Sequence, residues 1–197
     1  MHAPLVQIDK EHLQDFKVLF KTLEESKATV WISTPSFAEM CLVDPSFNQD
    51  LLPELEQFVF CGEKLFSTTV EKLMERFPRA EVVNTYGPTE STVMVTWMPL
   101  TRELLEKYPD NLPVGVIKPG TTVLIDGPES GEIIICGNTV AKGYYENPEM
   151  NAKHFFEVDG ERAYRTGDVG HFEGDLLFCE GRIDFQIKLH GHRIELE

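Results

Sequence analysis

Hydroxyl groups, a carboxylate and an aromatic ring are concentrated in residues 84–92, which read NTYGPTEST. Hydroxyls and exposed backbone N–H groups on a turn can hold phosphate oxygens. Glu90 could bind Mg²⁺, an ion that takes few protein oxygens and shares its other positions with phosphate and water. Tyr86 offers a flat ring to a base. The alternative is a turn whose side chains only cap the next segment, and these residues alone do not decide between the two.

Three further motifs follow in the second half: residues 164–168 (YRTGD), 181–184 (GRID) and 188–193 (KLHGHR). An ionised Asp168 has two acceptor oxygens, which suit the paired hydroxyls of a ribose. The donor fork of Arg182 suits ribose or phosphate. Taken alone, each motif has a simpler explanation: residues 164–168 as a solvated turn, residues 181–184 as a surface ion pair and residues 188–193 as a solvated basic loop. The sequence contains no GxxxxGK(S/T) loop, no GxGxxG loop and no GxSxG nucleophile turn.

Alternating strand and helix patterns in the first half of the chain determine where residues 84–92 lie. The β-prone runs are residues 29–33, 57–61 and 81–84, and the helical runs are residues 36–43 and 67–77. Ser67 is the expected N-cap of the second helix. This order predicts a βαβ arrangement with parallel strands. Residues 84–92 then lie just past the carboxyl end of the third strand, which is the edge where open α/β sheets bind ligands.

Short β segments dominate the second half and predict a small antiparallel unit. They are residues 112–117, 121–125, 132–136, 169–172 and 176–179, the last two joined by a hairpin at Gly174-Asp175. Residues 194–197 look like the opening turn of an element that is cut off, so the chain reads as a piece of a larger protein. The predicted class is α/β, divided into a three-layer βαβ portion (1–110), the antiparallel unit (111–181) and the start of a further domain (182–197).

Composition limits the class of protein. The chain has 197 residues and a net charge of −15, which argues against binding to nucleic acid or to an anionic membrane surface. No run is long and apolar enough to insert into a bilayer, and the first residues do not begin a signal peptide. The four cysteines form no CxxC pair, so we expect reduced thiols of a cytosolic protein and no zinc site.

The order NTYGPTE, YRTGD, GRIDFQIKLHGHRIELE resembles the adenylate-forming (AMP-binding) superfamily. Within it, the chain is most similar to the D-alanine–D-alanyl carrier protein ligases, through STPSFAEMCL, FCGE, RFPRAEVVNTYGPTESTVMVT, DGERAYRTGD and DFQIKLHGHRIELE. The resemblance covers nearly the whole chain, apart from residues 123–130, where the family usually has a longer loop. It implies a cytoplasmic enzyme that activates D-alanine with ATP and Mg²⁺. The D-alanyl group then passes to the phosphopantetheine thiol of a carrier protein, for D-alanylation of teichoic acids in the cell wall.

The resemblance also assigns residues to that chemistry. The ATP-binding residues would be Asn84, Thr85, Tyr86, Gly87, Pro88, Thr89, Asp168, Cys179, Glu180, Gly181 and Arg182. Tyr86 would lie against the adenine, Thr89 would meet the α-phosphate and Asp168 would take the ribose hydroxyls. Glu90 would hold Mg²⁺.

Four further residues receive roles in the same way. Cys61 and Val93 would shape the amino-acid pocket, where a small Cys wall suits a methyl side chain. A buried core thiol explains Cys61 equally well. Asp184 would be the hinge of the C-terminal domain, and Gly191 would lie near the pantetheine arm.

Several parts of the family's site would lie outside this chain. The resemblance places the phosphate loop and the Asp that binds the ammonium group upstream, and the catalytic Lys downstream. No catalytic set is therefore complete here, and we expect the isolated chain to be nearly inactive. The alternatives are a non-enzymatic remnant that binds nucleotide weakly, part of another amino-acid-adenylating domain, and part of an acyl-CoA ligase. An exposed sheet edge also predicts self-association.

Overall fold

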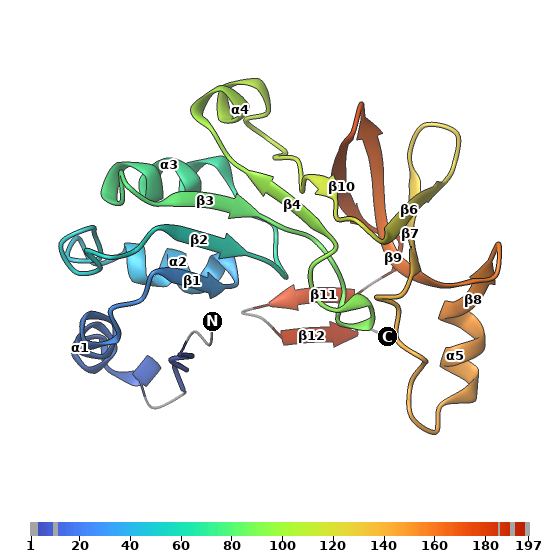
Figure 1. Ribbon diagram of the computed structural model, residues 1–197, viewed down its shortest axis with the longest axis horizontal. Helices are drawn as coiled ribbons and strands as arrows, with labels where there is room; N and C mark the ends of the chain where they lie inside the picture. The colour runs from blue at the N-terminus through green and yellow to red at the C-terminus, as the bar shows by residue number, and fades with distance from the viewer. Residues whose placement is uncertain (1–3, 10–11, 185, 190–191, 196–197) are drawn as a thin grey trace.

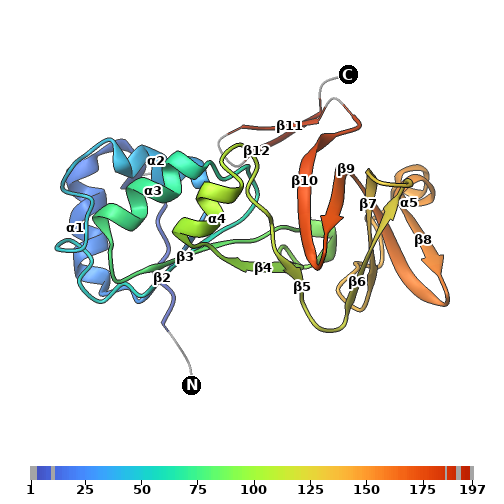
Figure 2. The same ribbon diagram turned by 90° about the horizontal axis from the view of Figure 1, so that it is seen from above.

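The computed structural model describes residues 4–9, 12–184, 186–189 and 192–195, and it is mixed α/β. Two sheets stand side by side, and helices pack on the first of them (Figures 1 and 2). A separate two-stranded hairpin follows, made of β11 (Gln186–Leu189) and β12 (His192–Glu195). The α/β class predicted from the sequence is confirmed.

The first sheet has five strands in the order β1-β2-β3-β4-β5. They are β1 (Val30–Ser33), β2 (Gln57–Phe60), β3 (Glu81–Asn84), β4 (Thr96–Pro99) and β5 (Val116–Ile117). β1, β2 and β3 are parallel, whereas β4 and β5 are antiparallel to their neighbours. The carboxyl ends of the three parallel strands therefore meet at one edge of the sheet, and residues 84–88 continue from that edge.

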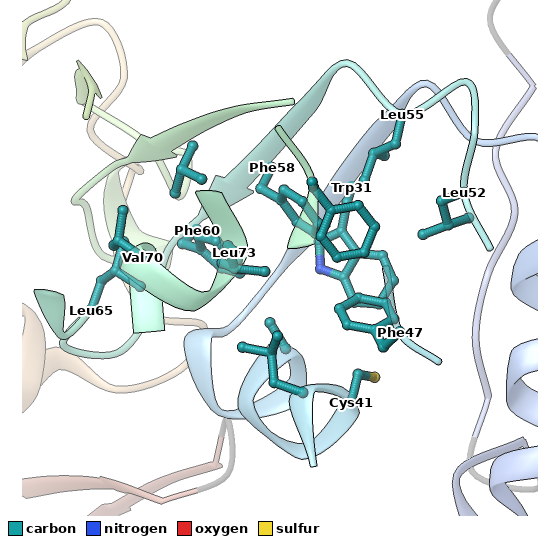
Figure 3. Packing of buried hydrophobic residues seen from close by; sticks show 14 of the residues in the cluster. Trp31, Cys41, Phe47, Leu52, Leu55, Phe58, Phe60, Leu65, Val70 and Leu73 are labelled. Carbon is teal, nitrogen blue, oxygen red and sulfur yellow. The ribbon is translucent and has the colours of Figure 1, made fainter. Parts of the chain in front are cut away.

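Helices pack against the first sheet and share one apolar core with it. They are α1 (Phe16–Ser26), α2 (Pro35–Leu42), α3 (Ser67–Arg76) and α4 (Arg102–Lys107), which contributes Leu105. The register pairs Trp31 with Phe58 and Phe58 with Val82, so these side chains point to the same face. Phe47 and Phe58 pack with Trp31 and with one another in the centre of this core (Figure 3). This packing fixes the direction of β3 and hence the place of the turn that follows it.

The second sheet is antiparallel and has the order β10-β9-β7-β6, with β8 paired to β9. Its strands are β6 (Thr121–Asp126), β7 (Gly131–Gly137), β8 (Phe155–Val158), β9 (Glu161–Glu173) and β10 (Leu176–Arg182). The remaining elements are η1 (His12–Gln14), η2 (Thr89–Ser91) and α5 (Pro148–His154). A bridge between Gly115 and Leu177 ties the two sheets together.

Two sequence-based expectations are corrected. Phe66, not Ser67, is the N-cap of α3, and the Ser67 hydroxyl instead donates to the carbonyl of Pro109 at 2.6 Å. Ile194 and Glu195 do not open a new element, because they end β12. Within the described ranges, no helix has both the length and the apolar character needed to cross a bilayer.

Candidate functional site

A cavity of about 240 Å³ lies where the carboxyl end of β3 meets β9 and β10. All the predicted ATP-binding residues line it except Pro88 and Thr89. The rest of the lining was not predicted from the sequence; it is Gly62, Glu63, Lys64, Leu65, Asn111, Leu112 and Val114. Residues 62–65 follow β2, so the rule that parallel strands share a carboxyl edge could have found them. No sequence signal points to residues 111–114, because their place depends on long-range folding.

The turn after β3 forms one wall and is held by its own polar groups. The Asn84 amide donates to the carbonyl of Pro113 at 3.0 Å, and the Thr85 hydroxyl donates to the carbonyl of Phe60 at 2.7 Å. The backbone N–H of Tyr86 donates to the Thr96 hydroxyl at 2.8 Å. Some of the polar groups that were predicted to bind a ligand therefore stabilise the turn itself.

Asp168 forms the facing wall and is 4% exposed. The Tyr86 hydroxyl donates to Asp168 Oδ2 at 2.6 Å, and Arg182 Nη1 donates to Asp168 Oδ1. Burial raises the pKa of Tyr86 well above its ordinary value, and the nearby Asp168 charge raises it further. The phenol therefore stays protonated and remains a donor at neutral pH. These bonds bring the two halves of the predicted site together.

Arg182 also connects the cavity to the predicted hinge residue. Its Nε and Nη2 donate to the two carboxylate oxygens of Asp184, each at 2.7 Å. Burial opposes the Arg182 charge, but the bonds with Asp184 and Asp168 outweigh it, so the pKa of Arg182 lies above its ordinary value. The guanidinium is thus a fixed positive charge between a buried and a half-exposed carboxylate.

Cys61 and Val93, the residues predicted for the amino-acid pocket, lie in contact. The Cys61 thiol donates to the Val93 carbonyl at 3.2 Å and lies 4.0 Å from the Gly87 carbonyl oxygen. Gly87 has no room for a side chain, since a Cβ there would lie 2.6 Å from the Val93 oxygen. The thiol is buried, as both the pocket interpretation and the core interpretation require.

Glu90, predicted to hold Mg²⁺, is 7% exposed and does not line the cavity. Its Oε1 accepts a hydrogen bond from the Tyr144 hydroxyl at 2.5 Å. A single carboxylate fits Mg²⁺, which retains several waters and binds phosphate as well. No group of three or more metal-ligating acids, histidines or cysteines occurs in the part of the chain that the structure describes. Thr89 is exposed at the start of η2, and Gly191 lies outside the described residues.

Comparisons with known proteins agree with this geometry. Residues 3–145 match the family model of the AMP-binding enzymes. The D-alanine–D-alanyl carrier protein ligase of Bacillus velezensis is 50% identical over 96% of this chain, and that of Bacillus cytotoxicus is 51% identical over the same share. The chain spans 39% of the length of each of these relatives.

Solved structures of adenylation domains have the same fold. A nonribosomal peptide synthetase protein with adenylation and PCP domains is 32% identical and has a TM-score of 0.80, covering 92% of this chain and 33% of that one. The Vibrio cholerae adenylation domain AlmE, solved with glycyl-adenosine-5′-phosphate, is 28% identical with a TM-score of 0.78, covering 90% of this chain and 36% of that one. Because the family model matches most of its residues, this chain belongs to the AMP-binding enzyme family.

Proposed function

We propose that this chain is the nucleotide-binding part of a D-alanine–D-alanyl carrier protein ligase. The observation that carries the proposal is the identity of about 50% over 96% of the chain to ligases of that name. The whole protein would activate D-alanine with ATP to form D-alanyl-AMP. It would then transfer the D-alanyl group to the phosphopantetheine thiol of a carrier protein in the cytoplasm, for D-alanylation of lipoteichoic acid.

The cavity between the two sheets supports nucleotide binding. Asp168 would accept hydrogen bonds from the ribose hydroxyls while Arg182 holds the carboxylate in place. The ring of Tyr86 would lie along the adenine. Glu90 would hold Mg²⁺, whose charge would offset that of the phosphate oxygens. Cys61 and Val93 would border the methyl group of D-alanine, and Asp184 would act as the hinge.

The domain boundaries remain proposals as well. Residues 1–110 would be the α/β portion, residues 111–181 the β-rich portion, and residues 182–197 the hinge and the start of the C-terminal domain. Of the alternatives, another amino-acid-adenylating domain is less favoured, because the solved adenylation domains reported above are 32% and 28% identical. A non-enzymatic remnant would keep the cavity but support no activation of D-alanine.

A chimera tests the proposal directly. Residues 4–184 replace the matching part of the Bacillus velezensis ligase, and D-alanine-dependent exchange of pyrophosphate into ATP is measured. We expect exchange by the chimera and almost none by the 197-residue chain alone. Asp168→Asn should lower exchange by at least about tenfold, because a charged acceptor is lost.

Asp175→Asn is the matched control for that variant, since it removes the charge of an exposed Asp in the turn between β9 and β10. It should leave exchange unchanged. A folded chimera that activates another amino acid in preference to D-alanine would refute the substrate assignment. A folded chimera with no exchange at all would favour the remnant.

A further inference from the structure

Asp168 reaches the cavity because β9 bulges there. β9 pairs with β7, and the register sets Arg165 opposite Ile134 and Val169 opposite Glu132. Residues 166–168 therefore face Ile133 alone, and this bulge interrupts the ladder. Bulges re-aim side chains and leave backbone groups that need other partners. The position of Asp168 thus depends on what holds residues 166–168.

Hydrogen bonds on both sides hold the bulge. On the side of β10, the Ile183 N–H donates to the Gly167 carbonyl at 2.9 Å. The Thr166 hydroxyl donates to the carbonyl of Ile133 at 2.7 Å, and the Asp168 N–H donates to that hydroxyl at 3.0 Å. The Gly167 N–H donates to Glu132 Oε1 at 2.9 Å. Gly167 has a φ of +72°, and a Cβ there would lie 2.7 Å from Arg182 Nη2. Arg182 therefore packs directly against the bulge that Glu132 holds.

Glu132 is itself fixed. Its side chain is 15% exposed, and its second oxygen accepts a hydrogen bond from Arg165 Nη1 at 2.7 Å. The same Arg165 nitrogen also donates to Asp126 at 2.9 Å. A carboxylate that accepts a backbone N–H makes a stronger bond than a neutral acceptor does. Glu132 does not line the cavity, so its influence on a bound nucleotide would be indirect.

We infer that Glu132 is a positioning residue for ribose recognition. Its carboxylate holds the Gly167 N–H, which sets the bulge and aims Asp168 at the ribose hydroxyls. The inference rests on the proposed function, because it takes Asp168 to be the ribose-binding group. It adds a specific consequence: loss of Glu132 reduces selectivity for the ribose hydroxyls rather than general affinity for the base and phosphates.

The test compares ATP with 2′,3′-dideoxy-ATP, which lacks both hydroxyls, by calorimetric titration of the full chain. The unaltered chain should prefer ATP. Glu132→Ala should weaken ATP binding by about tenfold and leave 2′,3′-dideoxy-ATP binding unchanged, so that the preference disappears. Glu132→Gln keeps an acceptor oxygen and should retain most of the preference. Asp126→Ala is the matched control, because it removes a partner of Arg165 without touching the Gly167 N–H.

Amide hydrogen exchange at Gly167 gives a readout that needs no ligand. It should become faster in Glu132→Ala and stay unchanged in Asp126→Ala. The inference is wrong if Glu132→Ala still prefers ATP, or if its affinity for both nucleotides falls by the same factor. It is also wrong if the exchange rate of the Gly167 amide does not change. If the unaltered chain binds neither nucleotide, or both equally, the proposed ribose site fails first and the inference fails with it.

Discussion

Tyr86 shows how one side chain can serve two purposes in the candidate site. Its ring borders the cavity, and its hydroxyl donates to Asp168 across the gap between the sheets. Because burial keeps the phenol protonated, this donor stabilises the buried Asp168 charge together with Arg182. Asp168 is therefore held in place by protein groups before any nucleotide reaches it. Such preorganisation reduces the ordering that a ligand would otherwise have to impose.

Cys179 offers a chemical probe of the cavity. It is half-buried and lines the cavity, whereas the other three cysteines are buried. Burial raises the pKa of Cys41 to about 12, so that thiol should not react near neutral pH, where only thiolates are nucleophilic. With iodoacetamide, we expect Cys179 to be alkylated first and saturating ATP to slow its alkylation.

Peptide mass spectrometry identifies the alkylated residue. Cys179→Ser should abolish the fast reaction and provides the control. Alkylation of Cys179 at the same rate with and without ATP would place the nucleotide elsewhere. Faster alkylation of Cys41 would contradict its burial in the core.

Local patterns predicted the three parallel strands of the first sheet, but not β4, and they wrongly assigned residues 112–117 to the second sheet, although β5 pairs with β4. The run at residues 81–84 became β3 with the expected bounds, because consecutive apolar residues here match a strand buried on both faces. β9 was predicted only from residue 169 onward, although it begins at Glu161. Thr166-Gly167-Asp168 reads locally as a turn, but bonds to Glu132 and Ile133 of β7, together with pairing of Asp168 to Arg182 of β10, keep it within the sheet.

Helix α1 was not predicted from the sequence, because it lies outside the strand–helix–strand pattern on which the prediction depended. Its helical spacing is visible in the sequence, since Leu19, Phe20 and Leu23 are the residues it buries. The helix lies before the first strand, where no βαβ argument requires an element. The two walls of the site were predicted by resemblance to a family, whereas their contact through Tyr86 and Asp168 could come only from the folded chain.

Gly87 is the residue on which the turn after β3 depends. A Cβ at this position would lie 2.6 Å from the Val93 carbonyl oxygen, and the backbone there cannot give way easily. Gly87→Ala should therefore lower the free energy of unfolding by about 1–3 kcal/mol and weaken ATP binding. Gly120→Ala is the control, since that glycine also has a positive φ but has no atom within 4 Å of its Cβ position. Urea unfolding of both variants makes the comparison, and equal losses would show that backbone strain alone is responsible.

The candidate site depends on how the two sheets meet. The Val114 N–H donates to the Leu177 carbonyl at 2.9 Å, next to the bridge between Gly115 and Leu177. The Tyr108 hydroxyl donates to Glu173 at 2.9 Å across the same junction. The cavity has walls from both sheets, so neither sheet alone can form it. A disturbance of this junction should therefore affect nucleotide binding even where no lining residue changes.

The edge of the first sheet determines how the chain should behave at high concentration. β1 is one of the two outermost strands of this sheet, and its side chains Val30 and Ile32 are 47% and 66% exposed (Figure 1). An exposed apolar edge strand can pair with another copy of the same strand. We expect weight-average mass in sedimentation velocity to rise with concentration. Ile32→Lys should reduce this rise and change stability by less than about 0.5 kcal/mol, because the site is on the surface.

Thr68→Lys is the matched control, since it adds the same charge to an exposed position of α3, away from the edge. A charge placed on an edge strand opposes pairing because the partner strand would have to bury it, whereas a charge on a helix surface remains in water. Thr68→Lys should therefore leave the association unchanged. If both variants reduce association equally, net charge and not the β1 edge controls it. If the unaltered chain is a monomer at every concentration, the edge is too short or too twisted to pair, and the expectation of self-association is wrong.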